Sequence, residues 1–217
     1  MERDFDVTSD IVRKRSREIG NNIMICFWIE ILGIVIPFLT VLMTMVSLLS
    51  WSATLMYSVA SLIKVVGLLV IISSIVYAVL LLTLKKYDDA FLYAGVLYAA
   101  SQIISFLQNY VPAGIGFLLS AANVVVTFLS VKYFIDALAN SVRLVSPGIA
   151  SSLEAYFYWY TIFMVASFVC VFAAFIPIIN IFAALVSVLI GIGSLIISIW
   201  RLVLVWQAAT SLQRAGR

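Results

Sequence analysis

Long apolar stretches separated by short polar ones dominate the pattern of this chain. Six of them follow one another, and a membrane-spanning helix needs roughly 20 consecutive apolar residues. They cover residues 22–49, 59–84, 90–108, 113–138, 156–176 and 181–206. Few residues remain between them, and no remaining segment is long enough to form a separate soluble domain. The pattern predicts an all-α fold, a polytopic bundle of about six transmembrane helices.

This pattern divides the chain into three parts. Residues 1–21 form a polar and basic N-terminal segment, residues 22–206 form the six-helix transmembrane domain, and residues 207–217 form a polar C-terminal tail. We expect both end segments to lie in the cytoplasm. The predicted connections on the opposite side of the membrane are 50–58, 109–113 and 177–180, and the longest inner loop is 139–152.

The composition supports a bilayer environment. Hydrophobic residues make up 65% of the 217 positions and charged residues 11%, whereas a soluble domain is typically ~45–50% apolar and ~25% charged. Both cysteines, Cys26 and Cys170, fall inside apolar runs. We therefore interpret them as small hydrophobic side chains rather than as a disulfide.

The distribution of basic residues predicts the orientation. Lys and Arg are enriched on the cytoplasmic flanks of membrane helices. With the N-terminus inside, the three outer connections carry no charged residue, and Lys64 alone among the basic residues lies in the outer half. The prediction is therefore N-in and C-in. The chain has no N-x-S/T acceptor and no large outer loop, which favours a bacterial inner (plasma) membrane.

A basic run precedes the first apolar stretch. Arg13, Lys14, Arg15 and Arg17 would lie near anionic headgroups, an attraction worth ~1 kcal/mol per basic residue. The lipid bilayer, with anionic lipids at these four residues, is therefore the expected partner. The alternative interpretation is that the run only fixes the topology.

Pro37 and Gly33 predict a kink in the first span. Proline removes a backbone donor and clashes with the preceding turn of the helix, and Gly33 lies four residues before it. Bent helices are common where transporters bind their substrate, but they also occur in bundles without transport.

Small and polar residues recur at helical spacing in two spans. They are Gly116, Ser120, Asn123, Thr127 and Ser130 in the fourth span and Ala183, Ser187, Gly191, Ser194 and Ser198 in the sixth. Each set lies on one helix face. Small residues allow close approach of helices in lipid, so we expect two helix–helix seams. A polar path through the membrane is the alternative.

Ionisable residues inside the membrane are the main functional candidates, because each costs ~2.5 kcal/mol or more at the bilayer centre. Glu30 lies eight residues past Asn22, roughly 12 Å into the helix. A polar network is predicted from residues that approach the same inner third: Glu30, Lys132, Asp136 and Arg201. Alternatively, the two basic residues reach out to the headgroups. Glu30 is expected to be either paired with a base or protonated.

Three further polar residues fall within the spans. Lys64 either extends towards the outer headgroups or attracts an anion in an outward-facing cavity. Gln102 and Asn123 lie nearer the middle of the membrane, where we expect them to form hydrogen bonds between helices or to line a cavity.

The residue content argues against an enzyme. The chain has no histidine, so a Ser-His-Asp triad, an HExxH zinc site and an imidazole base are excluded. Asp88 and Asp89 are adjacent rather than spaced like the acids of a Mg²⁺ site, and we interpret them as the start of the third span. No metal, cofactor or nucleic-acid partner is expected.

Two classes of function remain. In the first, the bundle binds or transports a small solute or ion, which Glu30, Pro37 and the polar stripes favour. In the second, the protein is a non-catalytic subunit or scaffold of a larger membrane complex, acting through a second copy or another membrane protein. The lack of a catalytic constellation favours that alternative.

Overall fold

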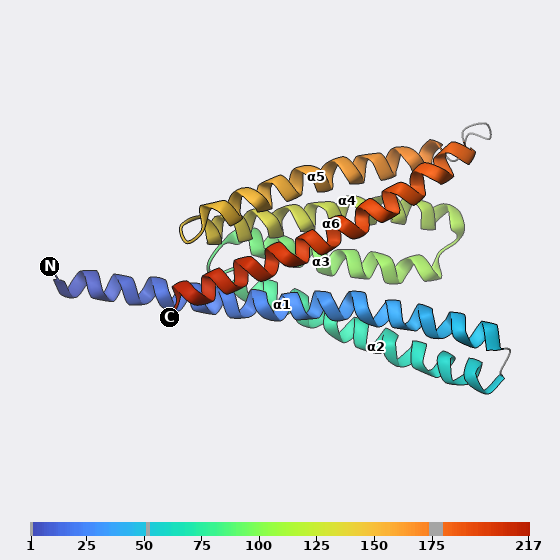
Figure 1. Cartoon of the computed structure of the whole chain (residues 1–217), viewed down its shortest axis with the longest axis horizontal. Coiled ribbons are helices and arrows are strands. Elements are labelled where there is room, and N and C mark those ends of the chain that lie inside the picture. Colours follow the sequence, from blue (N-terminus) through green and yellow to red (C-terminus); the bar gives the residue numbers. More distant parts are fainter. Residues whose placement is uncertain (1, 51–52, 174–179) are drawn as a thin grey trace. The chain divides into compact units, whose positions relative to one another are not determined.

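The chain is almost entirely helical. The computed structural model describes residues 2–50, 53–173 and 180–217. The elements are α1 (Glu2–Ser50), α2 (Ala53–Leu84), α3 (Asp89–Leu107), a short 3₁₀ helix η1 (Gln108–Tyr110), α4 (Ala113–Arg143), α5 (Pro147–Ala173) and α6 (Asn180–Ala215) (Figure 1). The described ranges contain no strand. The predicted all-α fold is confirmed.

Five of these helices are long and apolar enough to cross a membrane. The qualifying segments are Ile11–Val46, Ile63–Leu84, Asp89–Leu107, Gly114–Arg143 and Ile192–Ala215. Many large apolar side chains on them are exposed, as is expected where lipid rather than water is the solvent. The chain is a multi-pass membrane protein.

The chain forms two compact units. Met1–Asn21 and Ile135–Arg217 make up the terminal unit, and Asn22–Phe134 makes up the central unit. The boundaries fall inside α1 and α4, so each of these helices contributes to both units.

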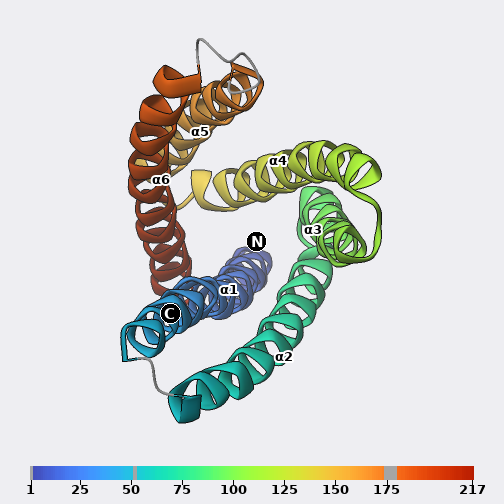
Figure 2. The same cartoon turned by 90° about the vertical axis from the view of Figure 1, so that its right-hand side faces the viewer.

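In the terminal unit, α5 and α6 lie antiparallel against each other (Figure 2). The ring of Tyr156 on α5 meets Trp200 on α6 edge to face, with 5.8 Å between centroids, and Tyr156 is only 1% exposed. Further along, Gly193 faces the ring of Phe163 so closely that a β-carbon there would overlap it. Any larger residue at position 193 would force the Phe163 ring to move, so glycine suits the close approach of these two helices.

The two ends of the chain also pack together in the terminal unit. A β-carbon added at Gly20 would lie 2.9 Å from the carbonyl oxygen of Ala209 and from the backbone nitrogen of Gln213. Beside this contact, Gln213 Nε2 donates to Asn21 Oδ1 at 3.0 Å. Both ends therefore lie on the same side of the membrane.

The central unit continues the up-and-down arrangement. The β-carbon position of Gly95 on α3 lies 3.1 Å from Leu81 Cβ on α2, so these helices touch almost backbone to backbone. Next to Gly95, Ser130 of α4 donates its hydroxyl to the Ala94 carbonyl oxygen at 2.9 Å. The described contacts of α2, α3 and α4 thus run in antiparallel order.

A side-chain capping interaction is found at the start of α3. Asp88 has extended backbone angles, φ −156° and ψ 129°, and its carboxylate accepts from the backbone N–H of Ala90 at 2.8 Å. Aspartate is a favoured N-cap because it satisfies a free donor of the first turn. The interpretation of Asp88 and Asp89 as helix-start residues is confirmed.

Several helices continue beyond the apolar runs, and two predicted connections are wrong as a result. Residues 2–21 and 207–215 are helical extensions of α1 and α6. The predicted inner loop 139–152 shrinks to residues 144–146, since α4 ends at Arg143 and α5 begins at Pro147, the first-turn position that proline favours. Similarly, α2 already begins at Ala53 in the predicted connection 50–58. The predicted return at 177–180 begins in residues that lie outside the described part.

No interruption of α1 occurs at Gly33 or Pro37. Two threonines donate to backbone carbonyls one turn earlier, Thr40 Oγ1 to Ile36 O at 2.9 Å and Thr44 Oγ1 to Thr40 O at 2.8 Å. Such bonds often bend a helix. The helix is continuous at these positions, and the kink stays a prediction.

We expect Gly95→Leu to weaken the protein, because side-chain atoms forced into the α2–α3 contact strain it, at about 1–3 kcal/mol for overpacking. Gly67→Leu is the matched control, because no described atom lies within 4 Å of the β-carbon position of Gly67. Thermal unfolding in detergent micelles measures both. Equal stability of the two variants would contradict the packing described for Gly95.

The contact between the chain ends predicts a specific cross-link. Asn21→Cys combined with Gln213→Cys, in a background without Cys26 and Cys170, should be joined rapidly in membranes by a short bifunctional thiol reagent. Lys14→Cys with Gln213→Cys is the control, two helical turns away. Labelling of the two ends by an impermeant maleimide from opposite sides would refute the shared location.

Candidate functional site

The central unit holds a carboxylate inside the bilayer, on α1. Glu30 accepts a hydrogen bond at Oε1 from the phenolic hydroxyl of Tyr77 on α2, with 2.9 Å between the oxygens. Tyr77 is only 6% exposed, and the second carboxylate oxygen of Glu30, Oε2, is buried. The Tyr77 hydroxyl therefore offsets part of the cost of burying this carboxyl group.

The depth of Glu30 follows from helix geometry. It lies within the membrane-compatible segment Ile11–Val46, roughly 12 Å past Asn22 at ~1.5 Å per residue. Tyr98 on α3 lies nine residues after Asp89, which gives roughly 14 Å from the same side. Glu30 and Tyr98, which both contact Tyr77, therefore lie at about the same level, well inside the hydrocarbon.

Two tyrosines form one wall of this site. The rings of Tyr77 and Tyr98 are 4.7 Å apart between centroids and tilted by 48°. The Tyr77 ring also lies 6.4 Å from that of Phe134 on α4. The aromatic contacts hold the Tyr77 hydroxyl near Glu30, because tilted ring pairs add packing energy beyond their buried area.

Polar contacts continue from the tyrosines along α3. Tyr98 donates its hydroxyl to Ser74 Oγ at 3.4 Å, and Ser74 donates to Gln102 Oε1 at 3.4 Å. Both distances exceed the usual 2.5–3.0 Å range for hydroxyl donors. These are weak bonds that a competing polar group can replace.

Contacts with α4 extend this row in both directions. Asn123 donates through Nδ2 to Ser105 Oγ at 3.0 Å, and Ser130 reaches the Ala94 carbonyl. The α3 positions in these contacts are Ala94, Tyr98, Gln102 and Ser105, spaced four, four and three residues apart on one face. We call these residues and their partners the polar ladder. Its eleven-residue span covers roughly 16 Å of the membrane.

The predicted intramembrane residues do not all lie in the same unit. Glu30, Gln102 and Asn123 belong to the central unit, where Gln102 and Asn123 make the predicted contacts between helices. Lys132 is exposed, with Nζ 6.0 Å from the ring centroid of Tyr133. Asp136 and Arg201 belong to the terminal unit. The observed partner of Glu30 is a phenol, and its network with the three charged residues stays a prediction.

Arg201 has aromatic surroundings in the terminal unit. Its charge interacts with the hydroxyl of Tyr160 on α5, and the Tyr160 ring stacks on Tyr156 at 5.9 Å. Lys64 is exposed near the start of the segment Ile63–Leu84, a position from which its long side chain can reach the outer headgroups.

The predicted seams are only partly found. On α4, Ser130 is buried and Asn123 contacts α3, whereas Ser120 is exposed and bonds only to the carbonyl of Gly116 on its own helix. On α6, Gly193 rather than Ser194 packs against α5. The side chains of Ala183, Ser187 and Gly191 lie outside the described part.

Tyr77, Tyr98 and Ser74 were missed by sequence reasoning. Tyrosine in a membrane protein is expected at the interface, but Tyr77 and Tyr98 lie seven and nine residues from the inner ends of their helices. Their depth matches that of Glu30 once the helices are taken as antiparallel. That match in depth was the available signal.

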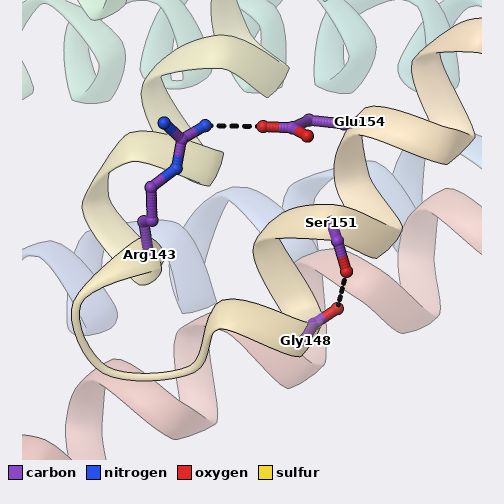
Figure 3. A network of polar contacts seen from close by, with 4 residues as sticks. All are labelled: Arg143, Gly148, Ser151 and Glu154. Carbon is purple, nitrogen blue, oxygen red and sulfur yellow. Dashed lines mark hydrogen bonds and ion pairs between the residues drawn. The ribbon is translucent and has the colours of Figure 1, made fainter.

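The connection between α4 and α5 holds a separate polar group (Figure 3). The guanidinium of Arg143 forms an ion pair with Glu154, with side-chain exposures of 56% and 57%. Ser151 and Ser152 both donate to the Gly148 carbonyl oxygen at 2.9 Å. An exposed ion pair contributes only ~0–1 kcal/mol to stability. We therefore interpret this group as a local contact that orders the first turns of α5.

Fold and site together define a class, a multi-pass α-helical membrane protein with hydrogen-bonded polar groups inside its central unit. Within the described residues, no group of three or more His, Cys, Asp or Glu is placed to hold a metal ion. Comparison of the chain with protein-family models, curated proteins and solved structures found no match. Function is therefore argued from the site.

We expect Tyr77→Phe to destabilise the protein by about 1–3 kcal/mol, because it removes the donor from a buried carboxylate oxygen. Tyr110→Phe is the control, since Tyr110 is largely exposed. In Tyr77→Phe/Glu30→Gln the loss should be smaller than the sum of the single losses, because the two groups interact. Unfolding in mixed micelles measures each variant; strict additivity would contradict the hydrogen bond.

Proposed function

We propose that the central unit binds a small solute or ion and moves it across the membrane, with Glu30 as the binding carboxylate. The observation that carries this proposal is the Tyr77–Glu30 hydrogen bond inside the bilayer. An acidic residue there costs ~2.5–3.5 kcal/mol on insertion scales. Intramembrane carboxylates commonly mark ion and substrate pathways.

The polar ladder supports movement as well as binding. Beyond Glu30 it offers hydroxyl and amide groups on three helices, including Ser74, Gln102 and Asn123. The 3.4 Å contacts of Ser74 are long, so a passing polar group can exchange with them at little cost. The ladder thus provides successive hydrogen-bonding positions over roughly half of a ~30 Å hydrocarbon core.

The carboxylate of Glu30 limits the cargo to a cation or a solute that donates hydrogen bonds. An ionised carboxylate only accepts hydrogen bonds, so Glu30 attracts a proton, a metal cation, an ammonium or a hydroxyl group. Tyr77 currently donates to Oε1. Arrival of the cargo would displace this hydroxyl, which can rotate about its C–O bond, and departure would restore the bond.

Native mass spectrometry of the protein released from its own membrane tests binding. A reproducible small-molecule adduct should be present in the wild type and lost in Glu30→Gln, which keeps shape but removes the charge. Glu154→Gln is the control, because Glu154 is a carboxylate in the exposed ion pair. In proteoliposomes, proton and sodium fluxes then separate ions from larger solutes, and Tyr77→Phe should change the rate at least several-fold. Identical adducts and fluxes in all variants would contradict the proposal.

One observation favours the alternative, a subunit or scaffold in a larger membrane complex. Gly33, Gly67 and Gly114 are exposed, and no described atom lies within 4 Å of their β-carbon positions. Exposed glycines on spanning helices allow another helix to approach closely. A stoichiometric second protein or second copy in the same mass spectra, without a small adduct, would support this function instead.

A further inference from the structure

The arginine-bearing segments at the two chain ends meet in the terminal unit. A β-carbon added at Gly216 would lie 2.5 Å from Arg17 Cβ and 2.8 Å from the Arg13 carbonyl oxygen. The end of α6 therefore rests directly on the segment of α1 that carries Arg13 and Arg17. Arg214 and Arg217 flank Gly216, and all four arginines are exposed. We call these four residues the terminal arginine cluster.

Basic residues outnumber acids around this cluster, and the acids nearest to Arg13 and Arg17 in the sequence are Asp10 and Glu18. The neighbouring segments 11–21 and 207–217 contain six basic residues and a single acid, Glu18. Like charges brought close together repel one another. The contact between the chain ends brings this repulsion into the folded state, and an anion bound among the arginines would relieve it.

The position of the terminal arginine cluster relative to the membrane indicates which anion its side chains can reach. Arg17 and Arg13 precede Asn22 by five and nine residues, or roughly 8–14 Å along the helix. Arg214 lies eight residues past Trp206, where the apolar run of α6 ends, or roughly 12 Å. The headgroup layer extends about 5–8 Å beyond the hydrocarbon, and long basic side chains reach back towards it. Both pairs therefore approach the phosphate level together.

We propose that the terminal arginine cluster binds the headgroup of an anionic phospholipid, in the leaflet on the side of the two chain ends. Guanidinium groups bind phosphate oxygens in a bidentate manner, and α1 and α6 each supply two of them. The bound lipid links the helix ends and thereby stabilises their contact. This goes beyond a basic run on α1 alone, because half of the site comes from α6, and it is independent of transport.

The test measures lipid retention. Protein is equilibrated in micelles with equal amounts of phosphatidylcholine and phosphatidylglycerol, and retained lipids are counted by native mass spectrometry. Two variants each remove one half of the cluster, Arg13→Gln/Arg17→Gln and Arg214→Gln/Arg217→Gln. Lys14→Gln/Arg15→Gln is the matched control, because it removes the same charge from the same segment without touching the contact with Gly216.

A fourth variant separates position from charge. Gly216→Ala keeps every arginine, but its β-carbon collides with backbone atoms of α1 and must push the end of α6 away. We expect it and both cluster variants to lower phosphatidylglycerol retention several-fold, and Lys14→Gln/Arg15→Gln to lower it much less. Wild-type retention in Gly216→Ala, or an equal loss in the control, would overturn the proposal in favour of diffuse attraction. Equal retention of both lipids by the wild type would also overturn it.

Discussion

Every polar group in the hydrocarbon must find its partner within the protein, because lipid tails offer no hydrogen bonds. This constraint explains why the described chain consists of helices with short connections. It also explains the many serine and threonine hydroxyls that bond to carbonyls one turn earlier, as Thr40 and Ser167 do. Glu30 is the costliest case, and the Tyr77 hydroxyl meets part of its need.

The same solvent also determines how the helices pack. Apolar side chains gain nothing by leaving lipid for another helix, so association depends on close backbone approach. Gly20, Gly95 and Gly193 provide that approach at three different helix pairs. Aromatic rings fill the wider gaps beside them, with Tyr156 against Trp200 and Phe91 against Phe134, 5.8 Å and 6.5 Å between centroids. The two units thus use one packing rule, small residues where helices touch and rings where they diverge.

Hydropathy predicted the helices and their order well, because lipid selects for long apolar runs. It could not predict where the helices end, since a helix continues into water once polar residues replace apolar ones, as 2–21 and 207–215 show. Glu30 was identifiable because a charge in an apolar run is conspicuous. Tyr77 and Tyr98 were not, because their role depends on which residues of antiparallel neighbours share a level. Gly20 and Gly216 were missed for the same reason, as their partners are about 190 to 200 residues away along the chain.

The 49-residue helix α1 belongs to both units without a break. Through Gly20 it is wedged against the backbone of α6, and ten residues later Glu30 is tied to Tyr77. The two units hold their own stretches of α1 by different means. The terminal unit does so by close backbone contact at Gly20, and the central unit by a hydrogen bond between the side chains of Glu30 and Tyr77.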